Sequence, residues 1–94
     1  AVFPDNSLRG QPALNGSYLL SDGRNGQPLL QLDADVLTAR RTAAASALAS
    51  RYLSRADSSH LLMMGAGRLA RALVDAHRAV RPIDTIHIWS RSAK

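Results

Sequence analysis

Several residue types are absent from this chain or scarce in it, and each absence narrows its function. The 94 residues contain no cysteine, which excludes disulfides and thiolate catalysis and suits a reducing compartment. The histidines lack the spacing of metal ligands, so no metal is expected. No apolar run approaches the roughly 18 residues of a membrane span, and the first residues lack the layout of a signal peptide. We therefore expect a cytoplasmic chain without a membrane partner.

Glutamate is also absent, and the only lysine is Lys94, so arginine carries nearly all of the positive charge. The formal net charge of +5 is compatible with nucleic-acid binding. The arginines are nevertheless dispersed, with Arg40 and Arg41 as the only adjacent pair, and aromatic residues make up only 4% of the chain. A single-stranded nucleic-acid site would combine a basic groove with aromatic side chains that stack on bases. We therefore expect no nucleic-acid partner.

The first half of the chain has the residue pattern of a loop followed by a β-hairpin. Proline, glycine and asparagine recur through residues 1–16, which predicts a loop. Two short apolar segments, 17–21 and 28–32, flank the turn-forming residues 22–27, and this pattern predicts a β-hairpin. The chain begins without a methionine and is shorter than a complete dinucleotide-binding fold. We therefore expect it to be a piece of a longer protein.

The hairpin is followed by a long helical segment and then by a second, different pattern. Asp33 or Asp35 is predicted to cap a helix that ends near Arg55. A polar linker follows this helix, which predicts a domain boundary between residues 1–57 and 58–94. Pro82 prevents a later helix from continuing. The segments predicted to form strand, helix and strand in the second part are 61–64, 68–80 and 86–89.

The most informative motif is G-x-G-x-x-A at residues 65–70, directly after an apolar strand and at the start of a helix. In a dinucleotide-binding βαβ unit, Gly65 makes the tight turn and Gly67 lets the backbone approach a pyrophosphate. Ala70 lets the helix pack closely on the strand, and the helix N-terminus faces the phosphate charge. The motif alone is weak because glycine- and alanine-rich segments match it by chance. Its position between strand and helix is what favours a nicotinamide dinucleotide.

The end of the second strand bears on which dinucleotide is bound. NAD-binding folds place an acidic residue there, about 20 residues beyond the glycine motif, to bind the ribose 2′-hydroxyl. Here the strand is followed by Ser90 and Arg91, while Asp84 precedes the strand and cannot substitute. An arginine beside a hydroxyl group suits a 2′-phosphate. This favours NADP(H) over NAD(H), with a solvated loop arginine as the alternative.

An arginine also interrupts the apolar stripe of the helix predicted after the hairpin. A guanidinium stays protonated, so Arg41 needs an anionic partner if it is buried. That partner is either a carboxylate of the protein or an anionic ligand, and spacing alone favours a paired arginine or one whose head reaches water. The residues that share this face by their spacing of three and four are Leu37, Arg41, Ala44, Leu48 and Tyr52.

Taken together, these motifs resemble the central part of the ornithine cyclodeaminase/mu-crystallin family. The resemblance covers nearly the whole chain, and its most specific element is the Leu-Thr-x-x-Arg-Thr-Ala-Ala helix start followed by the glycine motif. The matching segments are Phe3-Pro4-Asp5-Asn6, Gly10-Gln11-Pro12-Ala13, Tyr18-Leu19-Leu20-Ser21-Asp22, Asn25-Gly26-Gln27-Pro28-Leu29, residues 37–49 and Gly65-Ala66-Gly67. The resemblance implies an α/β chain that joins part of an α+β substrate/dimerisation domain to the first βαβ unit of a Rossmann domain.

The resemblance also implies a function and a set of site residues. Family members are homodimers that oxidise or reduce the α C–N bond of an amino or cyclic imino acid with NAD(H) or NADP(H). Arg41 matches the arginine that contacts the substrate carboxylate, which reverses the preference drawn from spacing. Ala13 departs from the threonine of several cyclodeaminases. The implied cofactor-binding residues are Gly65, Ala66, Gly67, Arg68, Leu69, Ser90 and Arg91.

The family's substrate-binding lysine and catalytic aspartate lie outside this stretch, so no catalytic residue is assigned and the piece alone is expected to be inactive. In the whole protein, the resemblance implies ornithine cyclodeaminase or pyrroline-2-carboxylate (ketimine) reductase activity. The alternatives are a non-catalytic NADPH-binding protein of the crystallin type and an alanine dehydrogenase.

Overall fold

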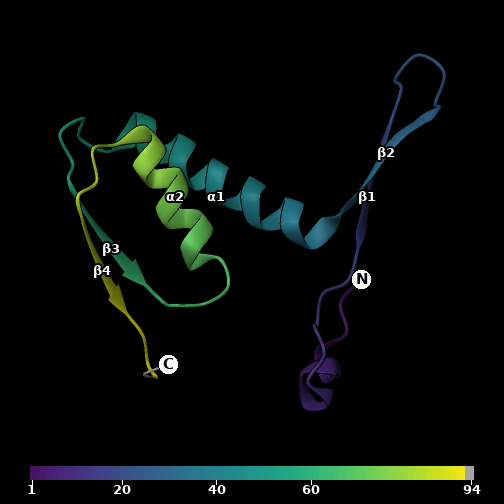
Figure 1. Ribbon diagram of the computed structural model, residues 1–94, viewed down its shortest axis with the longest axis horizontal. Helices are drawn as coiled ribbons and strands as arrows, with labels where there is room; N and C mark the ends of the chain where they lie inside the picture. The colour runs from purple at the N-terminus through teal and green to yellow at the C-terminus, as the bar shows by residue number, and fades with distance from the viewer. Residues whose placement is uncertain (93–94) are drawn as a thin grey trace. The chain divides into compact units, whose positions relative to one another are not determined.

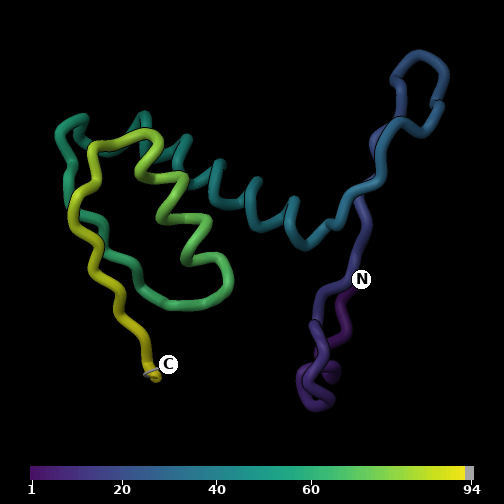
Figure 2. The backbone as a smooth tube through the Cα atoms, in the orientation of Figure 1, coloured from purple at the N-terminus to yellow at the C-terminus, as the bar shows by residue number. Residues whose placement is uncertain are grey.

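The computed structural model describes residues 1–92, which fall into two compact units, Ala1–Thr38 and the residues from Ala39 onward. Figure 1 labels the helices and strands, and Figure 2 traces the backbone through them. A short 3-10 helix, two α-helices and two separate two-stranded sheets are the regular elements of the described part of the chain. The predicted α/β fold class is therefore confirmed.

The N-terminal segment contains a short helix where the sequence analysis predicts only a loop. A 3-10 helix spans Pro4–Arg9 and ends at Gly10, whose φ of 67° lies in the left-handed region. Proline is well suited to the first position of a helix because its fixed φ is already helical and its missing N–H would have no partner there. The Ser7 hydroxyl adds a 2.9 Å bond to the Pro4 carbonyl oxygen. The loop prediction for residues 1–16 is therefore wrong over this helix.

The predicted hairpin is confirmed. Strand β1 (Ser17–Ser21) pairs antiparallel with β2 (Pro28–Asp33), and Tyr18 lies opposite Leu32. The register shifts at Leu20/Ser21, which is a β-bulge. Every residue of both strands is solvent-exposed within the described structure. An isolated two-stranded sheet is at best marginally stable, so this hairpin depends strongly on its turn.

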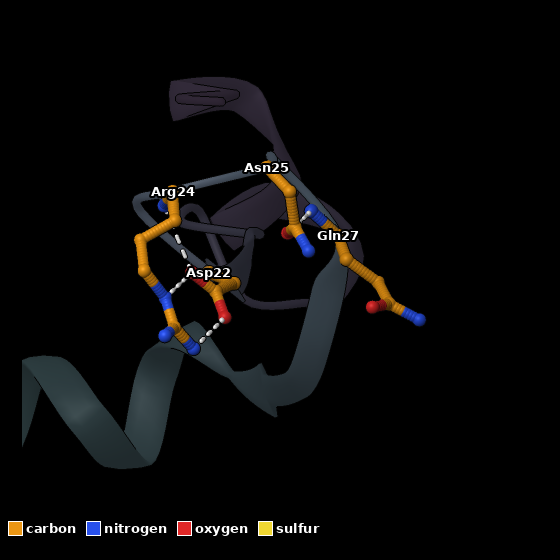
Figure 3. Close-up of polar contacts among 4 residues, drawn as sticks. All are labelled: Asp22, Arg24, Asn25 and Gln27. Carbon is orange, nitrogen blue, oxygen red and sulfur yellow. Dashed lines mark hydrogen bonds and ion pairs between the residues drawn. The ribbon is translucent and has the colours of Figure 1, made fainter.

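The turn of the hairpin is held by its own polar side chains (Figure 3). The Asp22 carboxylate accepts hydrogen bonds from the Arg24 backbone N–H at 2.8 Å and from its guanidinium at 3.1–3.3 Å. The Asn25 side-chain oxygen accepts from the Gln27 N–H at 3.0 Å. The Arg24 side chain, followed by its backbone N–H, lowers the pKa of Asp22 below its ordinary value. Gly26 adopts a φ of 73°, which glycine adopts without a steric penalty.

Helix α1 (Ala34–Leu53) follows β2 directly. The sequence left Asp33 and Asp35 as alternative caps, and the structure shows the Asp33 carboxylate accepting from the Asp35 N–H at 2.7 Å. Such a bond satisfies one of the amide donors that a helix start leaves without a helical partner. The helix ends two residues before the predicted Arg55.

The buried face of α1 consists of small residues. Ala43 is 2% exposed and Ala47 is 4% exposed, and their spacing of four places them on the same face. The apolar stripe lies on a different face, since Leu48 and Tyr52 are 55% and 78% exposed. The apolar stripe noted in the sequence is therefore not the most buried face of α1 in the described structure. Alanine occupies the buried face because small side chains allow close approach of neighbouring elements.

The second unit contains the predicted strand–helix–strand arrangement: β3 (His60–Met64), α2 (Ala70–Val80) and β4 (Thr85–Trp89). The strands are parallel, with Met64 beside Trp89 at their carboxyl ends. A helical crossover between parallel strands is the definition of a βαβ unit, so this prediction is confirmed. The helix begins two residues later than predicted, because the Ala70 N–H bonds to the Gly67 carbonyl oxygen in a preceding turn.

The two faces of this parallel sheet are unequally covered. Leu61 and Met63 are half-buried, whereas Leu62 and Met64 are 64% and 68% exposed. Successive side chains of a strand point to opposite faces, so one face is apolar and largely open. Parallel sheets are normally covered on both faces. The apolar composition of the strands is thus typical of a sheet in a larger α/β fold.

Candidate functional site

The turn between β3 and α2 requires its first glycine. Gly65 has a φ of 121°, a conformation that L side chains rarely adopt. Its N–H donates a 2.8 Å bond to the carbonyl oxygen of Trp89, the last residue of β4. This bond ties the turn to the end of the neighbouring strand. The predicted role of Gly65 in a tight turn agrees with this geometry.

The second glycine faces open space. A Cβ atom added at Gly67 would meet no heavy atom within 4 Å, and the φ of Gly67 lies outside the left-handed region. Neither packing nor backbone conformation therefore explains glycine at this position. The approach of a ligand to the backbone does explain it, because any side chain would occupy the space that the ligand needs. The glycine turn thus fits the pyrophosphate of a dinucleotide.

The start of α2 is also compatible with a bound anion. The helix has no acidic residue in its first turn, and Leu69, at the N-cap position, makes no side-chain cap. The N-terminal end of a helix carries partial positive charge and free amide donors. Ala66, Gly67 and Arg68 precede this end and are exposed to solvent. The arrangement can bind a phosphate group through backbone amides.

The second predicted cofactor segment lies close to the first. Ser90 and Arg91 directly follow β4, whose end is joined to Gly65 by the Trp89 carbonyl. The Ser90 hydroxyl donates to the Ser92 carbonyl oxygen at 3.0 Å. Arg91 is exposed and has no hydrogen-bond or ion-pair partner among residues 1–92. Gly65 and Trp89, 24 positions apart in sequence, therefore meet at the carboxyl edge of the parallel strands.

A groove runs beside this turn. It has a volume of about 520 Å³, and its lining is predominantly apolar. Arg71 is the one charged residue in its wall, and the sequence analysis did not select it. Its position one helical turn after Gly67 is the signal that could have identified it. The residues that line the groove are Ala66, Gly67, Ala70, Arg71, Val74, Ile86 and Ile88.

Arg41, the predicted substrate-binding residue, lies on α1 in the same unit as the glycine turn. Its side chain is exposed, and no hydrogen bond or ion pair of the described chain involves its guanidinium. The structure thus offers no protein carboxylate as its partner in this stretch. An arginine in this state can bind a carboxylate in bidentate geometry. No hydrogen bond or ion pair among residues 1–92 joins the Arg41 side chain to the glycine turn.

No group of three or more histidines, cysteines or acidic residues is arranged to hold a metal ion within residues 1–92. The rings of His60 and His87 stack with their centroids 6.4 Å apart. Neither helix in this part of the chain combines the length and apolar character of a membrane span.

Comparison with known proteins places these features in a family. The sequence matches the ornithine cyclodeaminase/mu-crystallin family over residues 1–94. A Delta(1)-pyrroline-2-carboxylate reductase of Colwellia psychrerythraea is 45% identical over 93 residues, which cover 98% of this chain and 29% of that protein. The Thermococcus litoralis Delta(1)-pyrroline-2-carboxylate reductase, in complex with NADH and L-proline, is 36% identical with a TM-score of 0.83, over 97% of this chain and 28% of that one.

A lysine cyclodeaminase, studied for recognition of L-lysine, L-ornithine and L-2,4-diaminobutyric acid, is also 36% identical. Its TM-score is 0.78, over 96% of this chain and 26% of that one. This chain therefore spans less than a third of each relative's length. The resemblance drawn from the helix start and the glycine motif is confirmed over the full sequence. On this evidence the chain belongs to the ornithine cyclodeaminase/mu-crystallin family, whose members named here are enzymes.

Proposed function

We propose that this chain is part of a nicotinamide-dinucleotide-dependent reductase that acts on the C=N bond of a cyclic imino acid. The observation that carries the proposal is the glycine turn, where Gly65 bonds to the end of β4 and Gly67 leaves open space for a ligand. Relatives of 45% and 36% identity are pyrroline-2-carboxylate reductases, one of them with NADH and L-proline. The family also contains cyclodeaminases, so cyclodeamination of ornithine is the second candidate.

The residues of the chain divide the work between cofactor and substrate. Gly65, Gly67 and the amides that open α2 hold the pyrophosphate, while Arg41 binds the substrate carboxylate by a bidentate contact. When bound, the reduced nicotinamide supplies a hydride to the α-carbon of the imine, and the nitrogen takes up a proton. Arg41 thereby fixes the orientation of the carbon that is reduced, which is how positioning contributes to rate.

The finer points of the proposal concern cofactor choice and organisation. Arg91 and Ser90 follow β4 without an acidic residue, which favours NADP(H) through contacts with the 2′-phosphate. Residues 1–57 belong to the substrate/dimerisation domain and residues 58–94 to the dinucleotide-binding domain. The exposed leucines of the hairpin suit a surface that is covered in a homodimer. Such an enzyme is proposed to work in the cytoplasm, with no nucleic-acid partner.

Turnover by the full-length protein tests this proposal. We expect it to convert Delta(1)-pyrroline-2-carboxylate to proline with NADPH, and with NADH at lower efficiency, followed by loss of absorbance of the reduced nicotinamide. Ornithine with the oxidised cofactors and pyruvate with ammonium serve as competing substrates. Faster turnover of ornithine would favour the cyclodeaminase, and faster turnover of pyruvate would favour the alanine dehydrogenase. Cofactor binding with no turnover of any substrate would indicate a non-catalytic protein of the crystallin type.

A further inference from the structure

Arg81 makes the largest set of side-chain hydrogen bonds within residues 1–92, and nothing in the glycine motif or the substrate helix accounts for it. It is the first residue after α2, and its guanidinium reaches the C-terminal end of α1. Nη2 donates to the carbonyl oxygens of Ser50, Arg51 and Ser54 at 3.2, 2.7 and 3.0 Å. Nε donates at 2.9 Å to both the Ser54 hydroxyl and the Arg55 carbonyl oxygen. The side chain thus caps α1 from a distant part of the sequence.

The physical reasons for this contact are clear from the elements that it joins. The last carbonyl groups of a helix lack intrahelical donors, and the helix end carries partial negative charge. A planar guanidinium donates to these acceptors from separate nitrogens, Nε and Nη2, whereas a lysine presents all three of its donors on one nitrogen. The Arg81 backbone is extended, with φ −139° and ψ 153°. The following Pro82 favours that conformation and so keeps Arg81 out of α2.

The contact joins the two parts of the proposed active site. Arg41 lies nine residues before Ser50 on α1, about 14 Å along the helix axis. Arg81 lies between α2, which begins at the glycine turn, and β4, which ends at Trp89. A tilt of α1 by about 5° around its capped end would move Arg41 by roughly 1 Å. A displacement of that size costs about a hundredfold in rate when it separates reacting groups.

From this geometry we propose that Arg81 is a positioning residue that sets Arg41, and through it the substrate carboxylate, relative to the bound dinucleotide. The proposal rests on the proposed function. Arg81 touches neither substrate nor cofactor in this arrangement and acts through α1. Its loss is therefore felt in the use of the imino acid and not in the binding of the dinucleotide.

The experiment compares four variants of the full-length protein: Arg81→Ala, Arg81→Lys, Arg41→Ala and Arg78→Ala. Arg81→Ala is expected to lower kcat/KM for Delta(1)-pyrroline-2-carboxylate about ten- to hundredfold, while the Kd for NADH changes by less than about twofold. Arg81→Lys keeps the charge at the end of α1 and is expected to restore part of that loss. Arg41→Ala provides the reference for a lost carboxylate contact. Arg78 is exposed on the last turn of α2 and serves as the control.

The outcomes separate the two proposals. An active wild-type protein in which Arg81→Ala behaves like Arg78→Ala would overturn the positioning role alone. Equal losses in NADH affinity and in kcat/KM would also overturn it, because they indicate general unfolding of the site. If Arg81→Ala does not fold, Arg81→Lys decides the question through the same two measurements. A wild-type protein that binds NADH or NADPH but reduces the imino acid with neither would instead refute the proposed function, and the role of Arg81 with it.

Discussion

The chain contains two two-stranded sheets, and they are built in opposite ways. β1 and β2 are antiparallel and joined by a turn whose side chains bond to one another. β3 and β4 are parallel and joined through a helix, and beyond their paired residues the Gly65 N–H donates to the Trp89 carbonyl oxygen. The hairpin is locally complete, whereas the βαβ unit leaves backbone and side-chain groups available at one edge. Polar groups that are already hydrogen-bonded within the chain stabilise its structure, whereas groups that are left available can bind a ligand.

The largest effect expected from this contrast between the two sheets comes from filling the open space at Gly67. Gly67→Val in the full-length protein is expected to raise the Kd for NADPH about a hundredfold, equivalent to roughly 2.7 kcal/mol. The free energy of unfolding of the protein should change by less than about 0.5 kcal/mol, because a Cβ atom at this position meets no protein atom within 4 Å. Cofactor fluorescence measures the first quantity and denaturant unfolding the second.

Gly65→Val is the matched variant for that experiment. Gly65 has a φ of 121°, which is strained for any residue with a side chain. The substitution should therefore lower the free energy of unfolding by about 1–3 kcal/mol, in addition to any effect on binding. The two glycines therefore separate a residue required by the turn from one required by the ligand. Unchanged NADPH affinity in Gly67→Val would show that the open space is not used, and the contrast between the two sheets would lose its functional meaning.

A smaller effect is expected at the end of β4. Arg91→Ala should raise the Kd for NADPH about tenfold and leave the Kd for NADH nearly unchanged, because only NADPH carries the 2′-phosphate that a charged hydrogen bond would recognise. The complementary Ser90→Asp variant introduces the acid that binds a ribose 2′-hydroxyl. It should weaken NADPH binding and strengthen NADH binding. Equal changes for both cofactors would show that Arg91 contributes general charge and does not select the 2′-phosphate.

The parts that sequence reasoning predicted well are those governed by local chemistry. The hairpin follows from the turn residues 22–27, and the βαβ unit from the spacing of strand, glycine motif and helix. The buried face of α1 could not be predicted from apolar spacing, since Ala43 and Ala47 are buried while Leu48 is exposed. Which face of a helix is covered depends on what packs against it, and a helical pattern alone does not contain that information.

Of the long-range contacts near the site, only some could be predicted from the sequence. The meeting of Gly65 with Trp89 was implied by the βαβ pattern, because carboxyl ends of adjacent parallel strands share one edge. The bonds of Arg81 to residues 26–31 positions away had no signal of that kind. An arginine before a proline predicts only where a helix ends. Its partners become visible only when the fold brings the end of α1 to it.

The smallest expected effect lies in the hairpin turn, where pairing is local and exposed. Arg24 holds the pKa of Asp22 below its ordinary value of 3.8. The carboxylate therefore binds protons less readily in the folded chain than in the unfolded one. The stability that it contributes is present above pH 3.8 and is lost as the pH falls through the lowered pKa. An exposed pair contributes little and is weakened by salt.

Arg24→Ala tests this prediction in full-length protein with isotope-labelled aspartate, by NMR titration of the carboxyl groups. The pKa of Asp22 should rise only part of the way to its ordinary value, because the backbone N–H of residue 24 still donates to the carboxylate. Asp57 is the internal control, since its lowered pKa depends on Arg55 and should not change. Cofactor affinity should also be unchanged. A loss of NADPH binding in Arg24→Ala would show that the hairpin turn also affects the cofactor site. The assignment of a purely structural role to the hairpin would then be wrong.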